Sequence, residues 1–317
     1  MLFPRLNINL KGDIEKIDQI ADKCHDYAKN YHSRCIVILD PFISPLEDDI
    51  LKYFQNPDQI AQVKILHPAV LASQRPVLLE LNLNNAFERD ILRYTIDQSL
   101  LELSPKTLSK SGKRHYSGWI FTQETAKKIA QGFALLALQK VTHGTILFRF
   151  YDPAVFPQLL TLLNPEQQAK VLGDIELWTL LDGNGDFYCH NNTQNKSPTW
   201  SRQLWINQQL EDQLYCIGIN NQAIKAYRKN NPTKKIDECK TLHHIMPCLL
   251  RLISQGFKDN ALLVPWAEIA INNDKDFDLH PQIQKKLKTF KTRYDFAPLL
   301  DILKRADWQL MLNTQSF

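Results

Sequence analysis

The sequence predicts an α/β N-terminal domain with a mixed sheet flanked by helices, followed by an all-helical C-terminal lobe. The first two-thirds of the chain alternates short apolar runs with segments of helical period, which is typical of layered α/β proteins. Beyond about residue 200 only helical periods occur. At 317 residues the chain exceeds one average domain. We place the boundary in the polar segment NNTQNKSPT, which predicts domains 1–195 and 196–317.

The composition is that of an ordinary globular protein, with 44% hydrophobic and 23% charged residues. Pro4, Arg5 and Asn7 interrupt the start before the apolar core of a signal peptide could form. No apolar run approaches the roughly 18 residues of a membrane span. We therefore expect a cytoplasmic protein. Its six scattered cysteines, without a CxxC pair, are expected to be reduced thiols.

The elements of the first half follow from periodicity. Apolar residues three and four apart predict a helix over 12–32, and CIVILDPF predicts a buried strand that ends at Asp40-Pro41. The next elements along the chain are a helix at 46–55, strands at 63–66 and 76–83, and a long helix at 87–103.

The second half continues the alternation. A polar loop at 104–114 precedes a strand at 116–121, and Thr122 is expected to cap the following helix. Later elements are a strand at 146–151, two Pro-initiated helices at 153–163 and 165–173, and a hairpin of strands 175–181 and 186–190. The helices expected in the C-terminal lobe are roughly 203–229, 236–255, 261–272, 281–290 and 297–311.

Arg149 is unexpected inside the apolar run ILFRFY. Period-two alternation places it on the face opposite Phe148 and Phe150. A buried guanidinium needs a carboxylate or carbonyl partner, because an unpaired buried charge is costly. Asp152 is the local candidate, and Asp40 ends another strand at an equivalent Asp-Pro step. We therefore interpret Arg149 as part of a structural lock at the end of the sheet rather than as a catalytic group.

A calcium loop is one alternative for LLDGNGDFYCH, which opens with Asp182, Asn184 and Asp186 at alternate positions. An EF-hand also requires glycine at the sixth position and glutamate at the twelfth. Here Phe187 and Thr193 occupy those positions. The two glycines suit a hairpin turn directly, so we favour the turn.

A zinc site is the alternative for CKTLHHIMPC, which holds Cys239, His243, His244 and Cys248. On one straight helix these side chains lie on two faces about 100° apart, and a single tetrahedral ion cannot easily collect all four. Pro247 also interrupts the hydrogen-bond ladder. We interpret the cysteines as core residues and the histidines as rim residues, and expect no metal.

Catalytic motifs are missing from the chain. The sequence has no GxSxG, GxxxxGK[ST], GxGxxG or HExxH. We therefore predict no catalytic residues, no cofactor and no enzymatic activity. Isolated histidines keep a hydrolase-like enzyme with a His/Asp site as an alternative. Glu47-Asp48-Asp49 stands at the front of a predicted helix, where carboxylates complement the helix dipole.

The basic charge is concentrated in the C-terminal part. Residues 201–317 hold 17 Lys and Arg against 12 Asp and Glu, mainly within 225–240 and 285–293. Such patches can attract nucleic acid or an acidic protein surface. No stacking aromatics interleave with these lysines, so solvated helix faces are favoured over a nucleic-acid-binding module.

The run FRFYDP at 148–153 is followed by LNPEQ at 163–167 and then by Gly173 and Trp178. With these motifs, of which FRFYDP is the most specific, residues 34–182 resemble the effector chaperones, or adaptors, of bacterial type VI secretion systems. The residues that carry the structural signature are Asp40, Arg149, Tyr151, Asp152, Pro153 and Trp178. The chain departs from the family pattern at Asp174, where proline is usual, and in a longer segment 41–75.

The resemblance implies a non-enzymatic role in the cytoplasm. Such adaptors bind one cognate toxin, keep it stable and hand it to the spike protein of the type VI machine; neither nucleic acid nor membrane is implied. We expect the helical lobe to select the toxin, and its aromatics, among them Tyr215, Trp266 and Trp308, to include interface anchors. The predicted partner-binding residues are Trp200, Trp205, Tyr227, Arg228, Lys229, Lys285 and Lys286.

Overall fold

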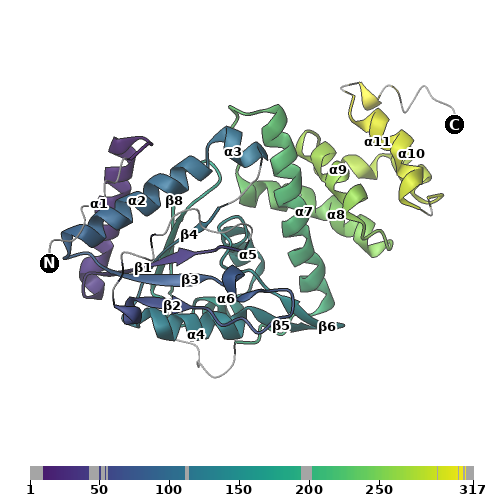
Figure 1. Cartoon of the computed structure of the whole chain (residues 1–317). Coiled ribbons are helices and arrows are strands. Elements are labelled where there is room, and N and C mark those ends of the chain that lie inside the picture. The colour runs from purple at the N-terminus through teal and green to yellow at the C-terminus, as the bar shows by residue number, and fades with distance from the viewer. Residues whose placement is uncertain are drawn as a thin grey trace. The chain divides into compact units, whose positions relative to one another are not determined.

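The chain folds into two compact units, Met1–Asn207 and Gln208–Phe317. The structure is a computed structural model (Figure 1). It describes residues 10–42, 50, 54, 56–110, 114–193, 202–290, 292–305, 307–309 and 311. An α/β first unit and a helical second unit confirm the predicted fold class.

The first unit is built on a six-stranded sheet with the strand order β2-β3-β1-β4-β7-β8. Its strands are β1 Arg34–Leu39, β2 Ile60–Gln62, β3 Val77–Asn82, β4 Tyr116–Phe121, β7 Leu177–Leu181 and β8 Phe187–Asn191. All neighbouring strands pair antiparallel, whereas the sequence predicted a mixed sheet. β3 and β4 do run parallel, but β1 lies between them, so the helical crossover that joins them creates no parallel pair.

Helices cover both faces of this sheet (Figure 1). α1 Ile14–Ala28 and α2 Ala86–Glu102 pack on one face, and α4 Ala126–Leu136 and α5 Phe156–Leu162 lie on the other. β1 is therefore buried on both faces, which explains its continuous apolar sequence. α6 Pro165–Leu172 follows α5 directly, with Asn164 as its N-cap.

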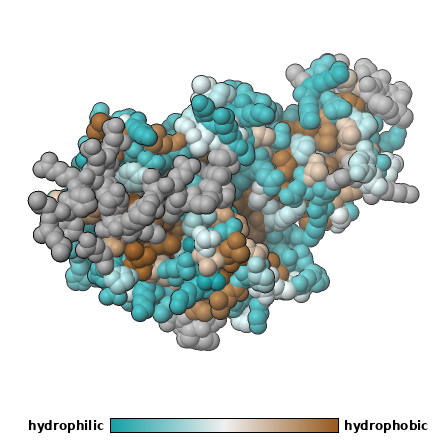
Figure 2. All heavy atoms as spheres, viewed as in Figure 1, coloured by the Kyte–Doolittle hydropathy of each residue, from teal (hydrophilic) through white to brown (hydrophobic). Residues whose placement is uncertain are grey.

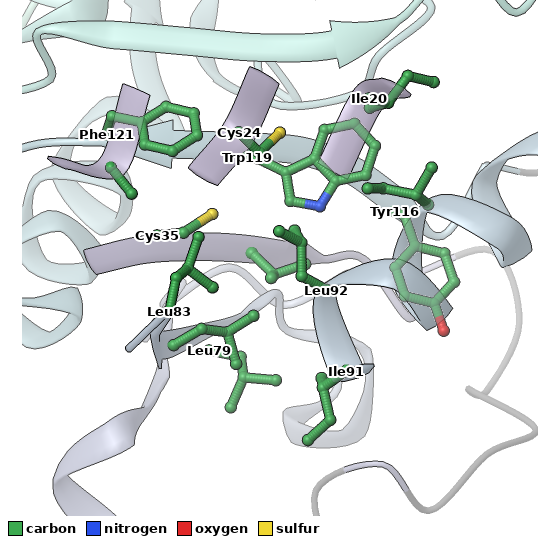
Figure 3. Packing of buried hydrophobic residues seen from close by; sticks show 14 of the residues in the cluster. Ile20, Cys24, Cys35, Leu79, Leu83, Ile91, Leu92, Tyr116, Trp119 and Phe121 are labelled. Atoms are coloured by element: carbon green, nitrogen blue, oxygen red, sulfur yellow. The ribbon is translucent and has the colours of Figure 1, made fainter. Parts of the chain in front are cut away.

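The core under α1 and α2 is one contiguous hydrophobic cluster (Figure 3). Ile17, Ile20 and Cys24 of α1 belong to it, spaced three and four residues apart as one helix face requires. β4 contributes Trp119, whose indole N–H donates to Thr95 Oγ1 at 3.0 Å. The helical periods in the sequence therefore reflect burial against the sheet.

Three predicted features between residues 63 and 125 differ from the structure, because each prediction treated a polar residue or an apolar run by itself. The strand expected at 63–66 lies earlier, as β2, and the polar loop expected at 104–114 contains the helix α3 Pro105–Lys110. The cap of α4 is Thr125. The Thr122 hydroxyl instead donates to the carbonyl of Asp174 at 2.6 Å. The helix expected at 46–55 and the carboxylates 47–49 lie outside the described residues, apart from positions 50 and 54.

The strand predicted at 146–151 is shorter and lies outside the main sheet. β6 Gly144–Leu147 pairs with β5 Leu138–Val141 in a separate two-stranded sheet. Beyond Leu147 the chain turns, with the Asp152 N–H donating to the Arg149 carbonyl at 3.1 Å. Phe148, Phe150 and Tyr151 are all buried. The prediction that alternate residues of this run face opposite sides is therefore wrong beyond the end of β6.

The second unit consists of helices around its own apolar core. They are α7 Gln208–Asn230, α8 Glu238–Ser254, α9 Asn260–Ile271, α10 Pro281–Leu287 and α11 Ala297–Leu303. Trp266 is fully buried, with its ring centroid 5.2 Å from that of Phe277 and 6.0 Å from that of Phe296. None of the helices in the described ranges is long and apolar enough to cross a membrane.

Candidate functional site

Arg149 joins two carboxylates that are far apart in the sequence. Its Nη2 atom lies 2.5 Å from Asp40 Oδ2 and 3.3 Å from Asp152 Oδ2. The Asp40 side chain is 1% exposed and also accepts the Phe42 N–H at 3.0 Å. The guanidinium carbon lies 4.6 Å from the centre of the Phe42 ring, within the range of a cation–π contact. The cluster ties the end of β1 to the turn that follows β6.

The protonation states of this cluster suit a fixed ion pair. Burial opposes the charge on Arg149, but Asp152 and Asp40 outweigh it and raise the pKa of the guanidinium. Burial raises the pKa of Asp40, and Arg149 opposes that shift. Burial, together with the charge of Asp40, raises the pKa of the Tyr151 hydroxyl. The guanidinium stays charged and the phenol stays neutral at physiological pH, so neither serves as a proton-transfer group there.

The other signature residues lie in an aromatic cluster beside the ion pair. Trp178 is fully buried and stacks on Phe156, with 4.1 Å between ring centroids, and on Phe133 at 5.5 Å. Tyr151 stacks on Phe133 at 6.4 Å. Pro153 is buried at the start of the next turn. These side chains hold the β5–β6 hairpin and α5 against the sheet, which is a packing role.

Arg202 is a buried charged residue that the sequence patterns did not predict. Its side chain is 6% exposed, donates to the Lys170 carbonyl at 3.1 Å and lies 3.7 Å from Asp174 Oδ2. Gly173 makes room for it, because a Cβ there would lie 1.8 Å from Arg202 Nη1. Asp174 stands where the adaptor family that the sequence resembles usually has proline. A carboxylate at this position indicated a cationic partner, but Arg202 lies too far along the chain for the sequence to assign it.

Arg202 begins a segment, 202–206, that is held on the first unit by backbone contacts. The Leu204 N–H donates to Gln139 Oε1 at 2.8 Å, and Gln167 Nε2 donates to the Leu204 carbonyl at 2.8 Å. Leu204 and Ile206 are buried. The first unit therefore extends to Asn207, beyond the domain boundary expected near residue 195.

Trp205 points out of this segment. It is 77% exposed and has a positive φ of 53°. A non-glycine residue in this region is uncommon and persists only where its surroundings hold it. Here the fixed neighbours Leu204 and Ile206 supply that restraint. The result is a large aromatic side chain presented to solvent on a restrained backbone.

The other predicted partner-binding residues differ in their exposure to solvent. Trp200 lies outside the described residues. Arg228 is buried, and its Nη1 lies 3.2 Å from Glu238 Oε1, so it serves the interior of the second unit. Lys229 and Lys285 are exposed, whereas Tyr227 and Lys286 are half-buried.

Two tryptophans considered as anchors also belong to the interior. Trp266 and Trp308 are buried in the second unit, and the Trp308 indole donates to Asn273 Oδ1 at 2.8 Å. Tyr215 is half-buried and its hydroxyl donates to Asn260 Oδ1. Helical spacing cannot separate such core aromatics from surface ones.

Two of the candidate zinc ligands and one of the candidate calcium ligands have other partners. His244 Nε2 lies 2.9 Å from the Asn273 carbonyl, and the buried Cys248 thiol donates to the Ile245 carbonyl at 3.0 Å. Asp182 Oδ1 accepts the N–H groups of Asn184 and Asp186, which makes it a turn residue. Across the described ranges, no group of three or more His, Cys, Asp and Glu side chains is placed to hold a metal ion.

Comparison with protein-family models connects this geometry to known sequences. Residues 50–170 match a domain of unknown function (DUF4123). The match contains the strands β2 to β6, the helices α2 to α5, and both Arg149 and Asp152. Asp40, Trp178 and Trp205 lie outside it. A search of curated proteins and a search of solved structures gave no match.

One prediction concerns His190, whose ring packs edge-on against Phe156 and which pairs with Trp178 across β7 and β8. Burial lowers the pKa of His190, so the folded protein binds this proton less readily than the unfolded chain, whose histidine pKa is about 6.5. The free energy of unfolding should therefore fall as pH drops below about 6.5. We expect His190→Gln to reduce this slope in urea titrations between about pH 7 and 5.

The exposed turn residue His143 provides the control. His143→Gln should keep the pH slope of the parent protein. An unchanged slope in His190→Gln would show that another group governs acid destabilisation.

Proposed function

We propose that the protein is an effector chaperone, or adaptor, of a type VI secretion system. In this role it binds and stabilises a cognate toxin in the cytoplasm and loads it onto the spike protein. The observation that carries the proposal is the match of residues 50–170 to a family known in type VI effector adaptors. The matched segment includes the Arg149–Asp152 turn, which belongs to the sequence run that resembles such adaptors.

The structure supports a binding role in physical terms. The ion cluster and the aromatic cluster give the first unit a rigid framework, and Trp205 stands out from it on a restrained backbone. Tryptophan is enriched among the few residues that dominate protein–protein affinity, because it buries a large area with little loss of conformational freedom. We therefore assign Trp205 as the principal toxin-contacting anchor of the proposed adaptor.

The direct test is affinity capture of the tagged protein from its native cytoplasm, read by mass spectrometry and sized by light scattering. A stoichiometric toxin-like partner, with traces of spike protein, is expected. Trp205→Ala should weaken the purified complex at least about tenfold, or 1.4 kcal/mol, with an unchanged melting temperature. Ile14→Ala is the matched control, since Ile14 is also exposed but lies on α1.

Other outcomes would contradict the proposal. A protein recovered alone would favour the hydrolase-like alternative, and the isolated histidines would then be replaced first. Recovery of nucleic acid that is lost with rising salt would favour the nucleic-acid-binding alternative. In that case Lys285→Ala with Lys286→Ala should reduce the salt dependence, whereas Trp205→Ala should not.

A further inference from the structure

A groove of about 500 Å³ lies between the edge strand β2 and helix α4. Small side chains create its depth, because Ala61, Ala130 and Ala134 leave room where longer side chains would fill it. Leu135, on its α4 side, is 49% exposed. Figure 2 shows apolar residues at the surface in the part of the view where Figure 1 places β2 and α4. The groove is therefore an apolar surface open to solvent.

One wall of the groove is a strand with an open edge. Among the described strands, β2 has a neighbour on one side only, namely β3. The Val63 N–H donates to the Pro76 carbonyl at 2.8 Å, which continues the register in which Ala61 pairs with Leu78. Antiparallel hydrogen bonding alternates along a strand, so the N–H and C=O of Gln62 face away from β3. Within the described residues, no strand pairs with this outward edge, so these groups are oriented to pair with an added strand.

The charged residues of the groove favour an acidic occupant. Lys64 lies on the β2 side and Lys127 on the α4 side, and both are exposed. Within the part of the chain that the structure describes, neither ammonium group forms an ion pair. Asp58 is the one carboxylate among the lining residues. The two lysines face solvent on opposite sides of an apolar floor, an arrangement that complements alternating apolar and acidic side chains.

We infer that this groove binds an extended segment of a partner protein, which adds as a strand to β2 and places apolar side chains over Ala130 and Ala134 and acidic ones beside Lys64 and Lys127. Strand addition of this kind takes its affinity from main-chain hydrogen bonds and its specificity from alternate side chains. An open strand edge beside an apolar floor supplies both. The inference goes beyond the proposed adaptor role, because it concerns a surface other than Trp205 and requires no toxin.

The test uses purified full-length protein and a displayed library of random peptides of roughly 12 residues, long enough to span the strand edge. Enriched peptides are expected to alternate apolar residues with Asp or Glu. Their affinities are then measured by fluorescence anisotropy. Gln62→Pro removes the outward N–H and should weaken binding at least about tenfold, while an edge position tolerates proline. Gln62→Ala is its matched control, because it keeps the N–H but loses the side-chain bond to the Ala72 carbonyl.

Separate variants test the charge of the two groove lysines and the free volume of the groove. Lys64→Glu with Lys127→Glu should weaken the enriched peptides at least about tenfold, whereas Lys11→Glu with Lys106→Glu, at exposed lysines outside the groove, should not. Ala134→Phe should block binding by filling the groove. Circular dichroism confirms that each variant is folded.

Three results would overturn the inference. The first is that no peptide is enriched on the parent protein relative to the Ala134→Phe variant. The second is that the enriched peptides bind Gln62→Pro as tightly as the parent. The third is a peptide consensus without acidic residues. A negative peptide result would not change the outcome of the affinity capture of a toxin. A failed affinity capture would not change the measured peptide affinities. The two proposals can therefore be rejected independently.

Discussion

Arg149→Ala is expected to lower the free energy of unfolding of the first unit by about 3 kcal/mol or more. The substitution leaves the Asp40 carboxylate, with 1% of its side chain exposed, without its cation. It also removes the pairing with Asp152 and the contact with the Phe42 ring. Calorimetric melting, which can resolve separate transitions of the two units, measures the effect.

Two further variants test whether the loss of the buried ion pair causes this destabilisation. Arg93→Ala removes a pair with Asp18 in which both side chains are at least one-third exposed, and it should cost no more than about 1 kcal/mol. Asp40→Asn added to Arg149→Ala should recover part of the loss, because the neutral amide needs no counterion. If Arg149→Ala melted like the parent but lost its partner protein, the structural interpretation of Arg149 would be wrong.

Gly118→Ala is expected to cost about 4 kcal/mol or more, which is exceptional for a single substitution. Gly118 lies in β4 with a φ of +126°, a conformation that L side chains rarely adopt. An added Cβ would lie 2.2 Å from the carbonyl oxygen of Thr179 on the paired strand β7. A backbone atom cannot move aside as a side chain can, so β4 and β7 would have to separate.

Gly218→Ala is the matched control. Gly218 lies within α7, and nothing is within 4 Å of the position that its Cβ would occupy. The same chemical change should here stabilise the second unit by about 0.5–1 kcal/mol, since alanine favours the helix. Melting temperatures and soluble yields of the two variants should change in opposite directions. A stable Gly118→Ala protein would refute the close approach of β4 and β7.

The features that depend on local periodicity and on charge could be predicted from the amino-acid sequence. Helical spacing predicted α1, α2 and the helical second unit, because one face of each helix must be apolar to pack. The glycine-rich turn predicted the β7–β8 hairpin. The cost of an unpaired buried charge was enough to name both carboxylates that contact Arg149.

The exposure of individual side chains depends on which surfaces meet in the folded chain, and residue spacing does not predict it. Trp205 and Trp266 both stand among apolar residues in the sequence, yet one is 77% exposed and the other fully buried. Phe148, Phe150 and Tyr151 share one interior because the chain turns after β6, which the apolar run itself does not reveal. The burial of Arg202 and the groove over Ala130 and Ala134 likewise arise between distant segments. Residue spacing describes one segment at a time, whereas exposure is set by the segments that pack against it.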